Sequence, residues 1–276
     1  MKNIAILLST YNGGKYLEDQ LCSLESQSAE KFHIYIRDDG SNDNTKEIIL
    51  KFIQRYKNCT LLESNNNLGA ANSFMEMLLQ VKADYYMFCD QDDIWLKDKI
   101  MNSYNYLKAI EDKKGIIPLL VFTDAKVVDA NLNTISDSFI KTSGIRTDFI
   151  NNKGYVLIKN ISPGCTYIFN RKLRDQAISY NSNLPMHDWW LVLKAIKTGE
   201  IHYFETSDIL YRQHDHNVIG VQENNLKLIL NKFININKTL KLQFSQYSFL
   251  KNEDLIDNYA TYMYYKVKYV LKTWFT

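Results

Sequence analysis

The chain passes from an apolar run directly into a group of carboxylates at Tyr85-Tyr86-Met87-Phe88-Cys89-Asp90-Gln91-Asp92-Asp93. Such an ending is typical of a buried strand that carries acidic residues at its carboxyl end. Side chains alternate along a strand, so Asp90 and Asp92 are expected to point the same way, while Asp93 begins the next turn. Carboxylates this close repel one another unless water or a cation offsets their charge, and Mg²⁺ or Mn²⁺ prefers such oxygen ligands. The stretch therefore predicts a metal site, and the alternative is a solvated acidic loop.

Upstream of this strand, apolar strands alternate with amphipathic helices. We expect strands at 4–8, 32–37, 60–63 and 85–89, and helices at 15–25, 44–56 and 70–81. This β-α-β-α-β-α-β order predicts a parallel sheet with right-handed crossovers. Because such sheets bind ligands beyond the carboxyl ends of their strands, the loops after these four strands are the candidate sites.

The second half of the chain is less regular. Strands are expected at 119–123, 165–170, 201–204 and 209–213, a helix at 191–197, and helical structure from 226 onward. No repeat or linker interrupts the pattern. We therefore expect one domain over residues 1–220 and a helical extension over 221–276.

Composition limits the class of protein. The chain has 276 residues, a net charge of +2 and 46% hydrophobic residues, which is ordinary for a globular protein and argues against nucleic acid as a partner. The four cysteines form no CxxC pair, so free thiols in a reducing cytosol are expected. The apolar run at 4–8 is too short for a secretory signal, and no run approaches the length of a membrane span. These features predict a cytoplasmic location.

Three more strand-end loops carry polar residues. Ser9-Thr10-Tyr11-Asn12-Gly13-Gly14 can hold the edge of a planar base, and Asp38-Asp39 suits the imide N–H of a pyrimidine or a ribose hydroxyl. Asn67-Leu68-Gly69 places backbone N–H groups at a helix N-terminus, which favours phosphate. Taken singly, the first and third loops are explained at least as well by turns and caps. In the second, Asp43 or Asn44 can cap the helix at 44–56, which leaves Asp38-Asp39 unexplained.

Taken in order, these segments resemble the inverting glycosyltransferases of family 2, which have the GT-A fold. The matching pieces are Ser9-Thr10-Tyr11-Asn12, Asp38-Asp39-Gly40-Ser41, Asn67-Leu68-Gly69, Asp90-Gln91-Asp92-Asp93, His187-Asp188-Trp189-Trp190 and Tyr211-Arg212-Gln213-His214. The resemblance covers roughly residues 3 to 220. It implies an α/β fold, a Rossmann-like and mostly parallel sheet flanked by helices, with a nucleotide-sugar half over about 1–100 and an acceptor half over about 101–220.

The resemblance also implies a nucleotide-sugar site and a metal site. The residues that would bind the nucleotide sugar are Ser9, Thr10, Tyr11, Asp39, Asn67, Gly69, Asp90 and Asp92. Asp92 would also hold Mg²⁺ or Mn²⁺, with Asp93 sharing or replacing that role and His214 completing the metal or diphosphate site.

The same resemblance makes Asp188 the catalytic base that takes the proton of the acceptor hydroxyl. The family's usual Glu-Asp pair is here His187-Asp188, and Asp188 can also cap the helix that follows it. Gly164 and Trp189 would lie on the acceptor side, where Trp189 could stack on a sugar.

The whole set looks most like the bacterial rhamnosyltransferase branch, which builds surface polysaccharides from dTDP-L-rhamnose. The partners implied are a nucleotide-sugar donor and a glycan or lipid-linked saccharide acceptor. Three alternatives stand beside it: a UDP-sugar donor such as glucose, galactose or N-acetylhexosamine, a noncatalytic nucleotide-sugar-binding protein, and a nucleotidyltransferase. The last expects a basic glycine-rich loop, and residues 9–14 contain no basic residue.

The C-terminal extension is rich in lysine and aromatic residues. In Tyr259–Phe275, two stripes have helical spacing: Met263, Val267, Val270 and Trp274, and then Tyr262, Tyr265 and Tyr269. Lysines beside Tyr and Trp suit a helix lying on the anionic inner face of the cell membrane. The alternative is a helix packed on the catalytic domain or on a second subunit in a homodimer.

Overall fold

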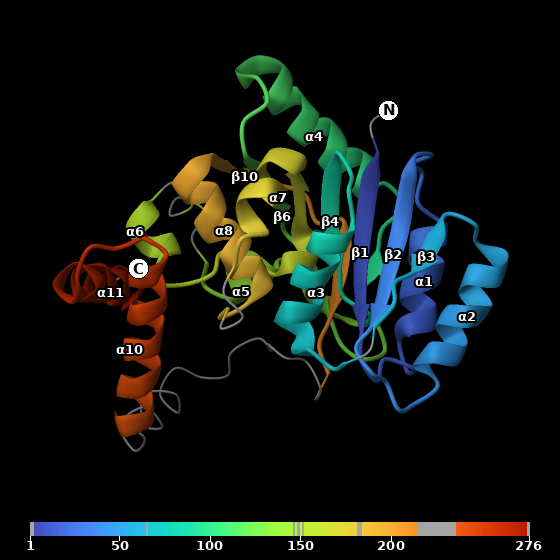
Figure 1. The fold of residues 1–276 in the computed structure, drawn as a ribbon, viewed down its shortest axis with the longest axis horizontal. Coiled ribbons are helices and arrows are strands. Elements are labelled where there is room, and N and C mark those ends of the chain that lie inside the picture. The colour runs from blue at the N-terminus through green and yellow to red at the C-terminus, as the bar shows by residue number, and fades with distance from the viewer. Residues whose placement is uncertain are drawn as a thin grey trace.

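The computed structural model describes residues 3–64, 66–145, 147, 150, 152–180, 184–214 and 236–274. Its centre is a seven-stranded sheet with the order β10-β6-β9-β4-β1-β2-β3. The strands are β1 (Ile4–Thr10), β2 (Phe32–Asp38), β3 (Cys59–Leu61), β4 (Tyr85–Cys89), β6 (Leu119–Thr123), β9 (Tyr167–Asn170) and β10 (Glu200–Phe204). Figure 1 shows this sheet running through the middle of the molecule.

The first four strands are parallel, as the β-α alternation predicts. β1 pairs in parallel with β2 on one side and with β4 on the other, and β2 pairs in parallel with β3. The strand order therefore reverses at β1, which makes the edge beyond β1 and β4 the expected ligand site. β9 is antiparallel to both β4 and β6, so the sheet is mixed.

Helices cover both faces of the sheet because its strands alternate between two apolar cores. On β1, Ile4, Ile6 and Leu8 enter one core, and Ala5 and Leu7 enter the other. The first core is closed by α1 (Leu17–Glu25), α2 (Thr45–Arg55) and α4 (Lys99–Lys114). The second is closed by α3 (Gly69–Gln80), α7 (Arg171–Ala177) and α8 (His187–Thr198).

A smaller sheet joins distant parts of the chain. Its order is β5-β11-β7-β8, built from β5 (Ile94–Trp95), β11 (Ile209–Arg212), β7 (Lys126–Val128) and β8 (Thr134–Ser136). β11 runs antiparallel to β5 and parallel to β7. This pairing brings the end of β11 to the acidic turn that follows β4. The short helices α5 (Phe139–Thr142) and α6 (Lys153–Val156) complete this half.

Two C-terminal helices, α10 (Ile236–Asn252) and α11 (Tyr259–Trp274), lie beyond α8 and α6, at the opposite end of the molecule from α2 (Figure 1). Their buried residues Tyr247, Leu250 and Tyr262 form a third apolar cluster with Trp189 and Leu193 of α8. The helical extension is thus confirmed, and part of it packs on the catalytic half. The predicted boundary at 220/221 and the start of helix at 226 lie outside the described residues, so the domain limits remain a prediction.

Several local predictions need correction. Of the two residues predicted to cap α2, Asn44 stands at the N-cap position but makes no side-chain cap bond, and the carboxylate of Asp43 accepts the Thr45 N–H at 3.0 Å instead. A 3-10 turn at Gly164–Thr166 precedes β9, so the strand begins at Tyr167 rather than at 165. α8 begins at His187 rather than at 191, which places Asp188 in its first turn and makes Met186 the N-cap.

The four cysteines are free, as predicted. In the part of the chain that the structure describes, no helix combines the length and the apolar content needed to cross a bilayer.

Candidate functional site

A cavity of about 890 Å³ opens beyond the carboxyl ends of β1 and β4. Its wall contains Ser9–Gly13 from the end of β1 and the loop beyond it, Asp39 after β2, and Asp90–Asp92 after β4. Residues from the second half close the other side, among them Gly164, Asp188 and His214. The fold therefore brings most of the predicted site residues to this one cavity. Asp93 and Trp189 do not line it.

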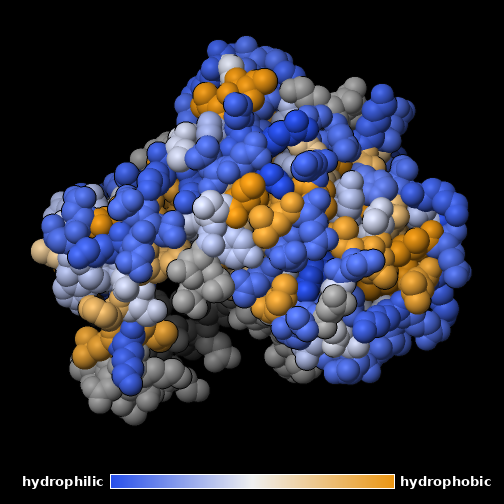
Figure 2. Space-filling model, viewed as in Figure 1, coloured by the Kyte–Doolittle hydropathy of each residue, from blue (hydrophilic) through white to orange (hydrophobic). Residues whose placement is uncertain are grey.

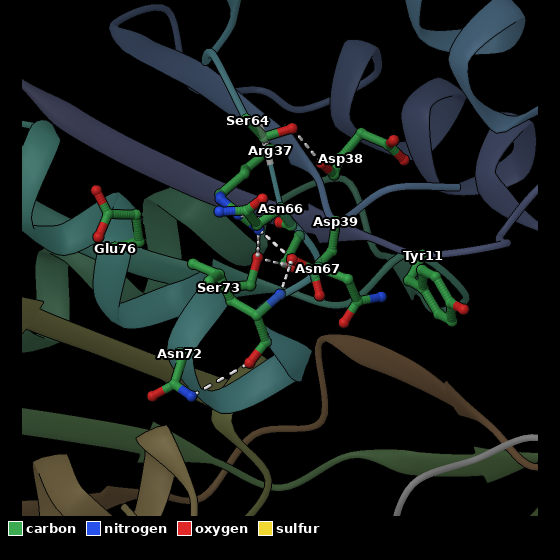
Figure 3. A network of polar contacts seen from close by, with 12 residues as sticks. Tyr11, Arg37, Asp38, Asp39, Ser64, Asn66, Asn67, Asn72, Ser73 and Glu76 are labelled. Carbon is green, nitrogen blue, oxygen red and sulfur yellow. Dashed lines mark hydrogen bonds and ion pairs between the residues drawn. The ribbon is translucent and has the colours of Figure 1, made fainter. Parts of the chain in front are cut away.

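Asp39 is held by a network that leaves little of its carboxylate free. Arg37 Nη1 donates to Oδ1, and the backbone N–H groups of Leu68 and Gly69 donate to Oδ1 and Oδ2 at 2.8 Å each. Arg37 also donates to Ser73 Oγ and to the Asn66 carbonyl, each at 2.9 Å, as Figure 3 shows. An ionised carboxylate offers about four lone-pair sites. Three are used, and the remaining one, on Oδ2, can accept a single further N–H.

Neighbouring predicted residues mainly shape this end of the cavity. Thr10 Oγ1 donates to the buried Asp38 carboxylate at 3.1 Å, and the Ser9 hydroxyl lies 2.7 Å from that of Ser73. Asp38 also accepts the Ser41 N–H at 3.0 Å, so it anchors the loop and does not line the cavity. Tyr11, with 47% of its surface exposed, is the residue at the rim that is open to a flat ligand.

The loop after β1 is tied to the acidic turn by Gln91. The Tyr11 N–H donates to Gln91 Oε1 at 2.8 Å, and Gln91 Nε2 donates to the Tyr11 carbonyl at 3.0 Å. A Cβ at Gly13 would lie 2.2 Å from Gln91 Oε1, so a side chain at this position would displace the Gln91 amide from its two bonds to Tyr11. Gln91 was not a predicted site residue, although its position between Asp90 and Asp92 could have indicated it.

Asp92 and His214 lie in contact on the cavity wall. His214 Nε2 lies 2.8 Å from Asp92 Oδ2, and the imidazole stacks on Tyr16 with 4.8 Å between ring centroids. A carboxylate and an imidazole at this spacing can hold a divalent cation. Mn²⁺ fits this mixed oxygen and nitrogen pair better than Mg²⁺, which prefers oxygen ligands alone.

Asp93 lies behind the wall. It is 1% exposed, and its Oδ1 accepts the Arg212 N–H at 3.1 Å. Arg212 in turn donates through Nε to the Asp92 carbonyl at 2.8 Å and through Nη1 to the Ala130 carbonyl at 2.9 Å. Asp93 and Arg212 therefore fasten β11 to the acidic turn. This placement favours Asp92 over Asp93 as the ligand.

A second group of potential ligands, Asp90, Asp93 and Cys165, also has its ligand atoms within 4.8 Å of one another. Burial raises the pKa of the Cys165 thiol well above its usual value, so the sulfur stays protonated. A hard cation does not select a thiol. Among the described residues, Asp92 and His214 therefore offer donor atoms that suit a divalent cation better than this group does.

Asp90 and Asp188 have carboxylates with altered acidity. Burial, followed by the charges of Asp92 and Asp188, raises the pKa of Asp90 to about 7. Burial raises the pKa of Asp188 to about 6. Hydrogen bonds from the Trp189 N–H at 2.6 Å, from the Asn160 side chain and from the Gly164 N–H act in the opposite direction. With a pKa of about 6, the Asp188 carboxyl group is mostly ionised at neutral pH and can still accept a proton readily.

Asn160 is a further site residue that the sequence reasoning missed. Its amide reaches Asp188, and its Oδ1 accepts a hydrogen bond from Tyr167 Oη at 3.2 Å. It lines the cavity and stands close before Ser162-Pro163-Gly164, a polar turn that could have pointed to it.

The two weak predictions for the acceptor side have different outcomes. Gly164 does line the cavity, and a Cβ there would lie 2.9 Å from His187 Nε2 and 3.0 Å from Asp188 Cβ. Trp189 is 8% exposed, its Nε1 donates to the Val156 carbonyl at 2.8 Å, and it packs against α10 and α11. Trp189 cannot stack on a ligand there, because α8 turns it away from the cavity; that prediction was wrong.

Comparison with known proteins agrees with this architecture. Residues 5–177 match the family described as Glycosyl transferase family 2. The chain is 31% identical over 226 residues to the dTDP-rhamnosyl transferase RfbG of Shigella flexneri, covering 77% of this chain and 73% of RfbG. It is 28% identical over 203 residues to the teichoic acid poly(glycerol phosphate) polymerase of Staphylococcus epidermidis, covering 71% of this chain but only 26% of that protein.

Solved structures share the fold. S. aureus TarS in complex with UDP-GlcNAc superimposes with a TM-score of 0.58 at 20% identity, covering 78% of this chain and 60% of that chain. The mannosyltransferase PcManGT from Pyrobaculum calidifontis, in complex with GDP-Man and Mn²⁺, gives a TM-score of 0.55 at 15% identity, with 77% and 56% covered. This chain therefore spans only part of each structure, and the likeness establishes a GT-A fold.

Proposed function

The chain belongs to glycosyl transferase family 2, and from that membership we propose that it is an inverting, metal-dependent enzyme that moves L-rhamnose from dTDP-L-rhamnose to a hydroxyl of a bacterial surface polysaccharide. One observation carries the proposal. Asp188 and the Asp92–His214 pair, which come from distant parts of the chain, line one cavity at the switch point of the sheet. Glycosyl transfer with inversion needs a base and a charge-neutralising group in that arrangement.

We assign the nucleotide to the end of the cavity formed by Ser9–Tyr11, Asp39 and Asn67–Gly69. The free acceptor site of Asp39 suits the single imide N–H of thymine or uracil. Guanine would present two adjacent donors and could satisfy only one of them. Tyr11 at the rim supplies a ring face, and Asp90 takes a ribose hydroxyl.

We assign the diphosphate to the Asp92–His214 end. A divalent cation bound there, Mn²⁺ or Mg²⁺, supplies positive charge for the leaving nucleoside diphosphate. The chain's own contribution is to hold the ligand pair in place, through Arg212 and Asp93 on one side and the stacked Tyr16 ring on the other.

We assign the base to Asp188. Its carboxylate takes the proton of the acceptor hydroxyl while that oxygen attacks the anomeric carbon from the face opposite the leaving diphosphate. Gly164 leaves open the space beside this carboxylate, and the Trp189 and Gly164 N–H groups fix its orientation. No general acid is needed for a diphosphate leaving group, in contrast to a glycoside hydrolase.

A thermal-shift panel tests the donor assignment. We expect dTDP and UDP, each with Mn²⁺, to raise the melting temperature clearly more than GDP, because only a pyrimidine matches the single free acceptor of Asp39. A ligand at about 100 times its Kd stabilises the folded protein by roughly 2.7 kcal/mol. dTDP-L-rhamnose should then release dTDP in the presence of acceptor. The same base contact suits a UDP-sugar, so turnover of UDP-glucose, UDP-galactose or UDP-N-acetylhexosamine instead would favour that donor. Binding without turnover of any donor would favour the noncatalytic alternative.

We further propose that α10 and α11 bring the enzyme to an anionic membrane that carries a lipid-linked acceptor. The Tyr stripe of α11 packs inward: Tyr262 is buried, and Tyr265 abuts Gly154 of α6. The opposite face is open, with Val267 51% and Leu271 52% exposed. α10 exposes further apolar residues, and Figure 2 shows apolar surface over that helix. Both helices carry lysines and no acidic residue within their bounds, which complements anionic lipid.

Vesicle binding tests this surface. Val267→Glu and Leu271→Glu should each weaken binding to phosphatidylglycerol vesicles about tenfold. Each removes exposed apolar surface that the lipid would bury, and each adds a negative charge that the anionic lipid repels. Ile116→Glu is the matched control, since it changes a similarly exposed residue (59%) on the loop before β6 and should leave binding unchanged. Equal binding by all variants rejects the membrane surface. A concentration-dependent dimer that these substitutions dissociate, without vesicle binding, would instead assign the face to a second subunit.

A further inference from the structure

His187 is a cavity residue whose ring has neither nitrogen hydrogen-bonded within the part of the chain that the structure describes. It is the first residue of α8, lines the cavity beside Asp188, and is only 4% exposed. Neither Nδ1 nor Nε2 has a hydrogen-bond partner among the described residues. A buried polar group without a partner is costly to folding, so a native structure that keeps two such atoms calls for an explanation.

The packing around the imidazole fixes its orientation without supplying a polar contact. The ring stacks on Phe74 at 4.2 Å between centroids and meets the Phe88 ring edge-on at 4.8 Å. Nε2 lies 2.9 Å from the position of a Cβ at Gly164, so a side chain at Gly164 would press on the imidazole and shift it. Two aromatic rings therefore hold the imidazole firmly at a position next to the proposed base.

The charge state follows from the same burial, which lowers the pKa of His187 to about 3. The ring is neutral at any physiological pH, with one N–H donor and one acceptor nitrogen. It cannot serve as a proton donor to a leaving group, and it adds no negative charge beside Asp188. A group that both donates and accepts, such as a hydroxyl, is the natural complement of a neutral imidazole.

We propose that His187 binds a hydroxyl group of a sugar ring at the reaction centre and thereby discriminates between sugars. The inference rests on the proposed function and deepens it, because it names the chemistry that the cavity reads beside Asp188. The hydroxyl belongs either to the sugar being transferred or to the acceptor saccharide. Both sources present the same chemistry to the ring.

Substitution by an apolar residue removes the hydrogen bonds and spares the packing. In His187→Phe we expect kcat/KM to fall about 10- to 100-fold, the effect of a lost hydrogen bond to a buried neutral group. His187→Leu covers the case in which a phenyl ring is too large beside Gly164. His187→Gln, which keeps a neutral donor and acceptor, should recover part of the loss. The melting temperature of the apolar variants should equal or exceed that of the wild type, since the unsatisfied nitrogens are gone.

Two further measurements separate a binding role from a structural one. The loss should be constant from about pH 6.5 to 9, because the imidazole does not titrate there. A nucleotide sugar should stabilise the protein more than its nucleotide does. If the hydroxyl is on the donor, His187→Phe should reduce this extra stabilisation, and it should also slow the transfer of the sugar to water in the absence of acceptor. If the hydroxyl is on the acceptor, only the acceptor KM should rise.

Folded His187→Phe and His187→Leu proteins with wild-type kcat/KM for both substrates overturn the inference and leave the proposed function intact. If the melting temperature falls in both apolar variants, and His187→Gln recovers none of the activity that these variants lose, His187 has a role in folding instead. If no nucleotide sugar stabilises the wild-type protein at all, the proposed function fails and this inference fails with it.

Discussion

Asp188→Asn is expected to lower kcat by about 10²–10⁴-fold, because an amide cannot take the proton of the acceptor hydroxyl. Asparagine has the same size and keeps an oxygen for the Trp189 N–H, so the local structure should be preserved. The affinity for dTDP or UDP, measured by calorimetry, should change little, since the proposed nucleotide site is at the other end of the cavity. Asp137→Asn is the control, because that side chain is 87% exposed.

The pH dependence gives a second check on Asp188. The base acts as a carboxylate, and its pKa is raised to about 6, so kcat/KM should fall about tenfold per pH unit below that value and level off above it. The raised pKa also has a consequence for stability. Between the unfolded pKa near 3.8 and the folded value, the folded state binds more protons, so stability is lost as pH rises through that window. At pH 7 the Asp188→Asn protein should therefore melt at the same or a higher temperature than the wild type.

A different result would reassign Asp188. If nucleotide-sugar affinity collapses while turnover at saturation is unchanged, the residue belongs to the donor site and another group must act as base. If melting drops at pH 7, the lost activity reflects unfolding.

Asp92→Ala is expected to lower transfer by about 10³-fold or more, because it removes a proposed ligand of the cation that would offset the charge of the leaving diphosphate, an effect of several kcal/mol. Asp92 is on the cavity wall and pairs with His214, so truncation should leave the fold intact. Asp93→Asn should cost less, since asparagine still accepts the Arg212 N–H and the residue does not reach the cavity. The ratio of the two losses ranks the two carboxylates.

Metal removal tests the same assignment independently. Dialysis against EDTA should abolish transfer, and Mn²⁺ should restore it at lower concentration than Mg²⁺, because the pair offers an imidazole as well as a carboxylate. His214→Ala should raise the Mn²⁺ concentration needed for half-maximal activity. Full activity in EDTA, or a larger loss in Asp93→Asn than in Asp92→Ala, would contradict the proposed metal site.

Much of the fold could be predicted because its signals are local. β4 and β6 begin and end where the apolar runs do, at Tyr85–Cys89 and Leu119–Thr123. The helices between the first strands follow from apolar spacing, and their order alone implies a parallel sheet. The weaker predictions were at element ends, such as the start of α8, because helix starts depend on backbone conformation at residues like Met186 that carry no capping signal.

The candidate site divides in the same way. The acidic and polar residues at the ends of β1, β2 and β4 could be found from the sequence, because alternation along a strand and the abrupt end of an apolar run are properties of neighbouring residues. Which of these residues face the cavity depends on contacts between distant parts of the chain. Asp93 contacts Arg212, which is 119 residues away in the sequence, and Asp92 contacts His214, which is 122 residues away. On α8, Trp189 packs in the C-terminal cluster, whereas His187 lines the cavity. The first two contacts exist because β11 pairs with β5 and β7, and the third because α8 packs against α10 and α11. No short stretch of sequence encodes such long-range contacts.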